Sequence, residues 1–166
     1  MKKNKFQIFL IIIILILIGV LIFFNQKRKN EFELVQAEAK EILKLINQAG
    51  EKALESKKAR PKPVAYGIFF DFDKAILFAD KNENKIFDYN AIDQYILNEN
   101  IRLNEQRIVY YLPYKESIEF CDVSRQCFDD IHPTVLISDI KTGRAIEFRF
   151  TKRNGKIELQ EVVDQF

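Results

Sequence analysis

The N-terminal part of the chain carries an unbroken run of apolar residues. Residues 8–24 are all apolar, and Phe6 extends the run across Gln7. At a rise of ~1.5 Å per residue, the 19 residues from 6 to 24 span about 28 Å, the thickness of one hydrocarbon core. A cleaved secretory signal has a shorter apolar region and a small-residue cleavage site, whereas here Phe24 leads directly into polar and basic residues. The pattern therefore predicts a transmembrane helix over residues 6–24 that is retained as an anchor.

A second pattern follows the basic flank. Apolar residues recur at steps of three and four, which places them on one stripe of a helix from about residue 31 to 58. The residues of this stripe are Phe32, Val35, Ala39, Ile42, Leu43, Ile46, Ala49 and Ala53. Neither Pro nor Gly separates the two apolar patterns, so we expect a single continuous helix that stops before Pro61 and Pro63.

The two halves of the amphipathic stripe are expected to have different packing partners. Its C-terminal half, residues 42–54, is expected to form the core face against the following domain. Its N-terminal half, with Phe32, Val35 and Ala39, is a candidate contact with neighbouring subunits, because one small domain cannot cover the whole helix.

Beyond Pro63 the apolar periodicity changes to about two, which is typical of antiparallel strands. Strands are expected at 64–70, 75–79, 107–112, 117–120, 134–139, 146–151 and 156–161, with turns at 71–74, 141–143 and 153–155. The segment 95–103 is either strand or loop. The expected fold class is α+β, with a long transmembrane-plus-amphipathic helix packed on an antiparallel sheet. The domains are an N-terminal tail (1–5), the membrane helix (6–24), a helical stalk (25–60) and a β-rich head (61–166).

Charge is distributed unevenly along the chain. Residues 1–29 carry six basic side chains and no acid, which leaves 20 basic and 24 acidic side chains for residues 30–166. An acidic head argues against nucleic acid as a partner. Because the lysines of the N-terminal tail favour the inner side of the membrane, we expect a single-pass protein with a cytoplasmic N-terminus and a periplasmic or extracellular head.

The order of these segments resembles the type IV pilins and the pseudopilins of type II secretion systems. Residues 65–70 (AYGIFF) and 75–84 (AILFADKNEN) look like the GYGVYF and YILFADxN pattern of GspH/FimT-like minor pseudopilins. Residues 135–158 look like the final hairpin of that family. The resemblance covers the chain from the stalk onward and implies a structural or assembly role beside other pilin-like subunits.

The N-terminus departs from the family pattern. Pilin precursors are cleaved between a Gly and an aromatic residue, with a Glu shortly after, whereas this chain has Lys5 before Phe6 and Leu10 where the Glu falls. No prepilin peptidase site is recognisable. The departure implies an uncleaved relative, an initiating component or a form that does not assemble.

The segment from Asp80 to Asp88 is a candidate calcium loop. Asp80, Asn82, Asn84 and Asp88 alternate, with the Ile86 carbonyl as a further ligand and Asp93 as an acid that could complete the shell. Lys85 stands where such a loop has Gly, and Ala91 where it has a bidentate acid. The alternative is a turn that caps itself through local hydrogen bonds.

Other reactive residues are few. Cys121 and Cys127 form a local disulfide if the head lies outside the cell and remain thiols if it lies inside. His132 precedes a Pro and has no nameable partner, so neither an enzyme nor a small-molecule substrate is expected. The tyrosines 110, 111 and 114 mark either strand core or a contact surface.

The sequence therefore leaves two candidate functions. The first is a membrane-anchored, pilin-like structural component that needs no cofactor. The second is a stand-alone surface or periplasmic binding module, stabilised by calcium at residues 80–88.

Overall fold

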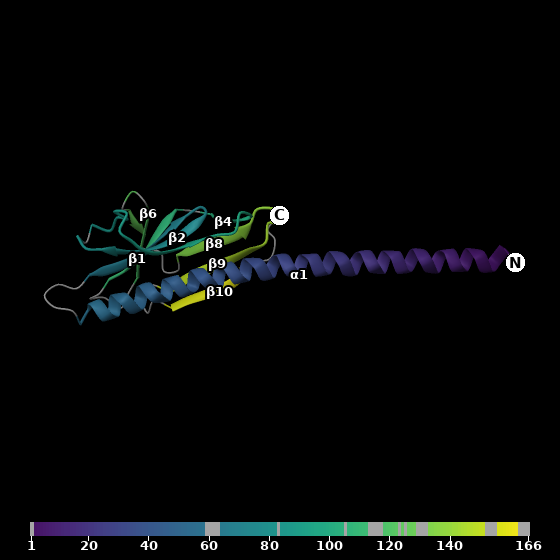
Figure 1. Cartoon of the computed structure of the whole chain (residues 1–166), viewed down its shortest axis with the longest axis horizontal. Helices are drawn as coiled ribbons and strands as arrows, with labels where there is room; N and C mark the ends of the chain where they lie inside the picture. Colours follow the sequence, from purple (N-terminus) through teal and green to yellow (C-terminus); the bar gives the residue numbers. More distant parts are fainter. Residues whose placement is uncertain are drawn as a thin grey trace. The chain divides into compact units, whose positions relative to one another are not determined.

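The computed structural model describes residues 2–58, 64–82, 84–104, 106–112, 118–122, 124, 126–128, 133–151 and 156–162. In these described segments one helix precedes ten strands, and Figure 1 shows the helix followed by the strands of the head. Their bounds are α1 Lys2–Ser56, β1 Ala65–Asp71, β2 Lys74–Asp80, β3 Ala91–Ile96, β4 Ile101–Leu103, β5 Arg107–Tyr111, β6 Ile118–Asp122, β7 Cys127–Phe128, β8 Thr134–Asp139, β9 Ala145–Thr151 and β10 Lys156–Val162. The fold class is α+β, as the sequence predicts.

The chain divides into two compact units, Met1–Leu34 and Val35–Phe166. The division falls within the segment expected to form the stalk. Helix α1 is continuous from Lys2 to Ser56, which confirms the prediction that nothing breaks the helix after Phe24.

The first unit contains the apolar part of α1. Every side chain from residue 9 to residue 30 is exposed, and the exposed fractions of the large apolar side chains reach 67% at Phe23. Within the described part of the chain, α1 is the helix that is long and apolar enough to cross a membrane. Since water is a poor solvent for such a surface, this part of α1 is suited to a lipid environment.

The described residues of the second unit form two antiparallel sheets. The first has six strands in the order β3-β2-β1-β5-β6-β7, and the second has four in the order β10-β9-β8-β4. The strands expected from the alternating pattern are present with ends shifted by at most two residues. The uncertain segment 95–103 contains the end of β3 and all of β4, whereas β7 is too short to show a pattern. The turn expected at 153–155 lies outside the described residues.

The two faces of the six-stranded sheet have different neighbours. The inner face carries Phe70 and Phe120, whose rings lie 6.4 and 5.5 Å from the ring of Phe150 on β9. It also carries Tyr111, which lies 3.6 Å from the position that a Cβ at Gly50 of α1 would take. The inner face therefore packs against both the second sheet and the C-terminal part of α1, and the opposite side is called the outer face below.

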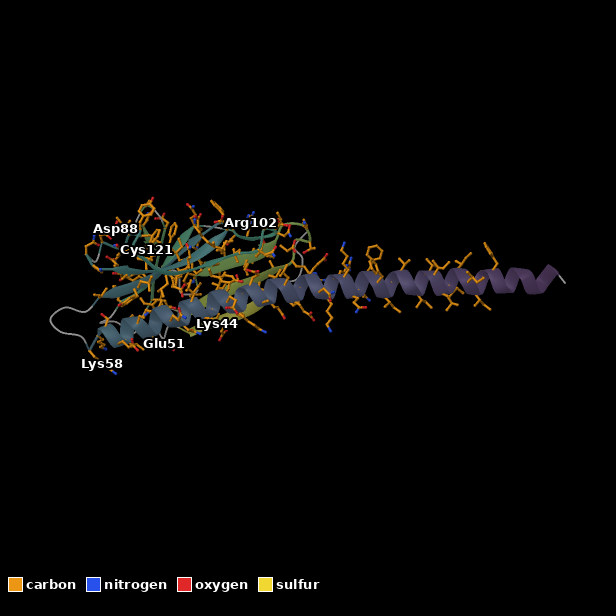
Figure 2. All side chains as sticks on the ribbon, in the orientation of Figure 1. Lys44, Glu51, Lys58, Asp88, Arg102 and Cys121 are labelled. Carbon is orange, nitrogen blue, oxygen red and sulfur yellow. A yellow bond between two sulfur atoms is a disulfide. The ribbon has the colours of Figure 1, made fainter. Side chains whose placement is uncertain are left out.

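The buried stripe of α1 explains how the helix joins this core. Helix residues from Val35 to Ala53 that share one face are buried, as expected for an amphipathic helix packed on a sheet. Lys44 and Glu51 lie on α1 and Lys58 in the turn that follows it, all three with exposed side chains, and Figure 2 labels them. The prediction that residues 42–54 form a core face is confirmed for Ile42, Leu45 and Ile46, while Leu54 is 62% exposed.

Candidate functional site

The outer face carries an aromatic and aliphatic cluster. Because side chains alternate along a strand, Phe69 of β1 shares this face with its register partners Ile76 on β2 and Ile108 on β5. Phe78 and Tyr110 form the neighbouring row, opposite Gly67. Phe78, Ile108 and Tyr110 are almost completely buried even though neither α1 nor the second sheet covers this face.

The segment that covers the cluster is the β2–β3 loop, residues 81–90. Phe87 stacks on Phe69 with ring centroids 5.2 Å apart and an interplanar angle of 13°. Phe87 also meets the edge of Phe78 at 5.5 Å and contacts Tyr89 at 5.4 Å. Tyr89 itself is 89% exposed and has a positive φ of 57°. Sequence reasoning missed Phe87 and Tyr89, although their spacing around Asp88 places two rings on one side of an extended loop.

Asp80 fastens the start of this loop to the sheet. Its carboxylate accepts hydrogen bonds from the Tyr110 hydroxyl at 2.9 Å and from the backbone N–H groups of Lys85 at 2.8 Å and Asn84 at 3.2 Å. A second tie is the ion pair between the Lys85 ammonium and the Glu119 carboxylate on β6. These contacts hold the loop over the outer face.

The candidate calcium ligands form a turn that is hydrogen-bonded within itself. The Asn82 and Asn84 amide nitrogens both donate to the Asp88 carboxylate, at 3.0 and 2.9 Å. The Asn84 amide oxygen accepts the Ile86 backbone N–H at 2.9 Å. This is the pattern of a self-capping turn, which was the alternative to a cation site.

Calcium binding at this turn stays a prediction. A cation would need the oxygens of Asp80, Asn82 and Asn84, which already accept backbone N–H groups. Lys85 adopts a φ of 61°, the left-handed conformation that calcium loops assign to Gly. The backbone thus takes the sharp turn, while the lysine charge stays near the would-be ligands.

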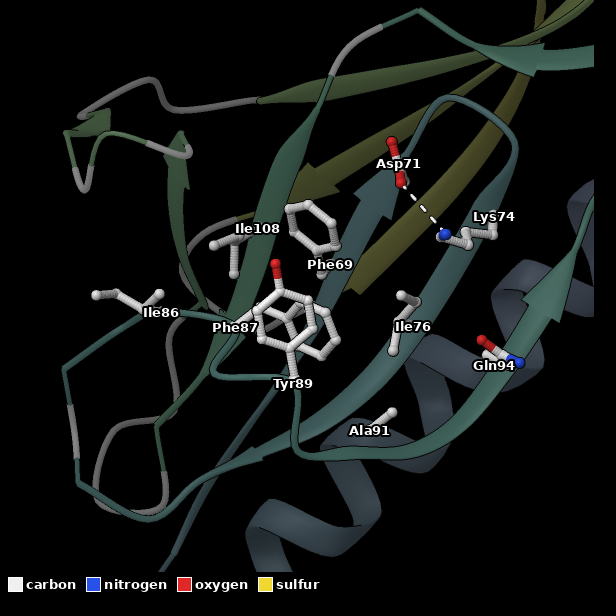
Figure 3. Close-up of a pocket in the computed structure, with 10 residues that line it drawn as sticks. All are labelled: Phe69, Asp71, Lys74, Ile76, Ile86, Phe87, Tyr89, Ala91, Gln94 and Ile108. Atoms are coloured by element: carbon white, nitrogen blue, oxygen red, sulfur yellow. Dashed lines mark ion pairs between the residues drawn. The ribbon is translucent and has the colours of Figure 1, made fainter.

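Beside the loop, the outer face is hollowed into a groove of about 560 Å³ (Figure 3). Its walls are apolar except for Asp71, Lys74 and Gln94. The lining residues are Phe69, Asp71, Lys74, Ile76, Ile86, Phe87, Tyr89, Ala91, Gln94 and Ile108. The volume lies within the range of small-ligand pockets.

One end of the groove is polar. The Lys74 ammonium lies 3.6 Å from the Asp71 carboxylate, which also accepts hydrogen bonds from the Gln106 amide at 2.8 Å and the Phe72 backbone N–H at 2.9 Å. Partial burial acts to raise the pKa of Asp71, but these hydrogen bonds and the lysine charge together lower it. The carboxylate is therefore held in its ionised form.

Cys121 and Cys127 face each other across β6 and β7, with Cα atoms 3.9 Å apart, and form a disulfide. The structure thus shows the bonded alternative of the two that the sequence left open. Glu119 shares the outer face with both sulfurs, and the three potential ligand atoms lie within 4.8 Å of one another. Because metals bind the thiolate form, the bonded sulfurs are poor ligands.

At the adjacent turn, hydrogen bonds from Ser124 and Gln126 lower the pKa of Asp122.

A buried carboxylate lies between α1 and β3. Glu38 is 7% exposed, and one of its two oxygens has no hydrogen-bond partner among the described residues. Burial raises the pKa of Tyr95 to about 12, assisted by its hydrogen bond to Glu38 and by the charges of Glu38 and Glu41. Glu38 went unnoticed in the sequence, where a polar residue beside Val35 and Ala39 on the apolar stripe was the available signal.

The candidate subunit contacts need a correction. Val35 and Ala39, expected to face neighbouring subunits, are fully buried within the chain itself, and only Phe32 is partly exposed. The physical reason is that the second unit covers the helical stripe from Val35 onward. An amphipathic stripe does not specify whether its partner belongs to the same chain.

The structure also decides between the two interpretations of the tyrosines, strand core and contact surface. Tyr110 is completely buried in the outer-face cluster, and burial raises the pKa of Tyr111 on the inner face. Both therefore belong to the core, the first of the two interpretations. Tyr114 and His132 lie outside the described residues.

Comparisons with models of protein families, with curated proteins and with solved structures found no match.

Proposed function

We propose that the protein is a membrane-anchored, pilin-like structural or assembly component of a type IV pilus or a type II secretion-like system. The observation that carries the proposal is the continuity of α1. One helix supplies both an exposed apolar segment of membrane length and an amphipathic segment that is buried in an antiparallel head. The resemblance of residues 65–84 and 135–158 to GspH/FimT-like pseudopilins points to the same role.

The proposed orientation places the head outside the cytoplasm. Three basic residues flank the apolar segment on each side, Lys2, Lys3 and Lys5 before it and Lys27, Arg28 and Lys29 after it, so the basic flanks alone do not set the orientation. The disulfide of β6 and β7 supports the same orientation, because such bonds persist in oxidising compartments. The role is one of packing and requires no catalytic group or cofactor.

Assembly would depend on contacts in the bilayer. The apolar segment has no acid at position 10, so neighbouring helices have no buried charge by which to register. Gly19 is the smallest residue of this segment, and a Cβ placed there would meet nothing within 4 Å. Small residues allow close approach between membrane helices, and we therefore assign Gly19 to the subunit contact.

Photo-crosslinking of the full chain in its own membranes tests this proposal. A photoreactive residue at position 22, one helical turn from Gly19, is expected to form adducts with other single-pass membrane subunits. Gly19→Leu should reduce those adducts, while the same photoreactive residue at the exposed Glu51 of α1 serves as a matched control. Adducts with lipid alone, unchanged by Gly19→Leu, would contradict an assembly role.

The alternative function is a stand-alone binding module outside the membrane. The groove on the outer face is the observation that favours it. A calcium-dependent rise in the melting temperature of the full chain, abolished by Asp88→Asn, would support the calcium-stabilised form. Recovery of pilin-like partners with the intact protein would instead favour assembly.

A further inference from the structure

Strand β3 forms one edge of the six-stranded sheet. Among the described strands it pairs with β2 alone, so the backbone groups on its other side are left without a strand. Exposed edges of this kind are usually protected by charged side chains, Pro or β-bulges. Strand β3, AIDQYI, has neither Lys nor Pro, but its register with β2 shifts between Leu77 and Phe78, and the Asp93 carboxylate accepts the Gln94 backbone N–H at 2.8 Å. The edge is therefore only partly protected against pairing.

The side chains of β3 add an apolar surface to this edge. Ile92 and Ile96 are 46% and 63% exposed. Between them, Gln94 points toward the outer face, where it pairs in register with Ile76 and forms the rim of the groove. Figure 3 shows Gln94 and Ala91 on this strand at the side of the groove. The free edge and the groove therefore form one continuous surface.

The other side of β3 is acidic. Asp93 is exposed and lies next to Tyr95, whose pKa is raised in part by the charges of Glu38 and Glu41 on α1. One oxygen of the buried Glu38 has no hydrogen-bond partner among the described residues. The charge of Glu41 is compensated by its ion pair with Lys44, so a cation close to Asp93 and Tyr95 would meet the negative potential of Asp93 and Glu38.

We propose that the free edge of β3 binds an extended segment of a partner protein in which apolar and cationic side chains alternate. The partner backbone would hydrogen-bond to β3 as an added strand. Because strand side chains alternate between faces, its apolar residues would lie against Ile92, Gln94 and Ile96 while its Lys or Arg residues lie near Asp93.

The charge on β3 also decides against a second copy of this chain as the occupant. A second β3 would bring another Asp93 to an edge that is already acidic, and like charges on neighbouring strands are destabilising. A basic segment, by contrast, would be attracted to Asp93 in the same position. The surface therefore favours a basic strand from a different protein, whether or not the chain also assembles as proposed above.

A synthetic peptide tests the proposal on the full chain in detergent. The probe alternates Lys with Val and carries one central Phe, with blocked termini. The peptide is expected to bind the protein, as measured by fluorescence anisotropy. Its binding should also slow amide hydrogen exchange at residues 91–96. A peptide with Glu in place of Lys should bind at least about five-fold more weakly, because attraction becomes repulsion. A Lys peptide that is N-methylated on alternate residues should not bind, since its backbone donors are lost.

Variants of the protein complete the test. Asp93→Lys is expected to weaken binding of the Lys peptide about five-fold and to improve binding of the Glu peptide. Glu51→Lys changes the net charge equally on an exposed site of α1 and should leave both affinities unchanged. Circular dichroism of Asp93→Lys establishes that the variant is folded.

Three results would overturn the proposal. These are equal affinity for the Lys and Glu peptides, undiminished binding of the N-methylated peptide, and hydrogen-exchange protection that falls outside β3. Pairing of two copies through β3, seen as concentration-dependent protection without peptide, would assign the edge to a homodimer instead. None of these measurements depends on subunit crosslinks in the membrane, so this proposal and the assembly role can fail separately.

Discussion

Gly67 lies beneath the aromatic cluster of the outer face, and its replacement by alanine tests how that face is built. A Cβ at this position would lie 2.8 and 2.9 Å from the Cζ and Cε1 atoms of Phe78 and 3.1 Å from the backbone oxygen of Val109. Phe78 is completely buried and in contact with Phe87, and Val109 belongs to the strand paired with β1. Neither neighbour can move without disturbing the sheet or the loop over it.

The expected cost follows from this overpacking. An extra methyl group in a close-packed core costs about 1–3 kcal/mol, so we expect Gly67→Ala to lower the free energy of unfolding by that amount. For a domain of this size, the melting temperature should fall by about 3–4 °C per kcal/mol. Thermal unfolding of the full chain in detergent, followed by circular dichroism, measures the change.

Gly50→Ala is the matched control. A Cβ at Gly50 would lie 3.6 Å from the Tyr111 ring, an ordinary contact, and Gly50 is inside α1. Because alanine is favoured over glycine in a helix interior, this variant should gain up to about 1 kcal/mol. The described packing of Phe78 on β1 would be refuted if the Gly67→Ala protein were as stable as the wild type, or more stable than the Gly50→Ala protein.

Three further predictions concern the disulfide and two carboxylates. The Cys121→Ser and Cys127→Ser double variant should lose about 2 kcal/mol, the loop-closure value for so short a loop, and reducing agent should lower the melting temperature of the wild type but not of the variant. Glu38→Gln should lower the pKa of Tyr95 from about 12 by the part that Glu38 contributes, since burial, the largest cause of the raised pKa, remains; an ultraviolet pH titration measures the change, and stability should be unchanged or raised because a buried carboxylate with an unpaired oxygen is removed. The lowered pKa of Asp71 means that its carboxylate stabilises the fold above about pH 4 and that this contribution is lost as the pH falls through the folded-state pKa. Asp71→Asn should therefore reduce stability at neutral pH and flatten its acid dependence, whereas an unchanged acid limb in urea unfolding would contradict the assignment.

Local patterns in the sequence were sufficient for most of the secondary structure. Apolar residues that recur at steps of three and four predicted the part of α1 that ends at Ser56. The alternation of apolar and polar residues predicted strands such as β8 over Thr134–Asp139. These elements are specified by periodicity, which depends on neighbouring residues alone. The division of the strands into sheets of six and four was not predictable, because it depends on pairings such as that of β4 with β8.

The candidate site was predictable only in part. The oxygen-rich turn at residues 80–88 was recognised, and the structure shows the local hydrogen bonds of one of its two interpretations. The groove was missed because Phe69, Ile76 and Ile108 come together through strand register across the sheet. Val35 was misassigned because an apolar helical stripe is the same for an intramolecular and an intermolecular partner.

Retention of the membrane helix is the central claim, and the N-terminal sequence and intact mass of the protein extracted from its own membranes test it most directly. An uncleaved anchor predicts that Phe6 and the whole of residues 8–24 remain attached to the head and that the protein resists extraction at alkaline pH. A mature protein that begins beyond Phe24 and is recovered in the soluble fraction would contradict the anchor, and with it the assembly role in the bilayer.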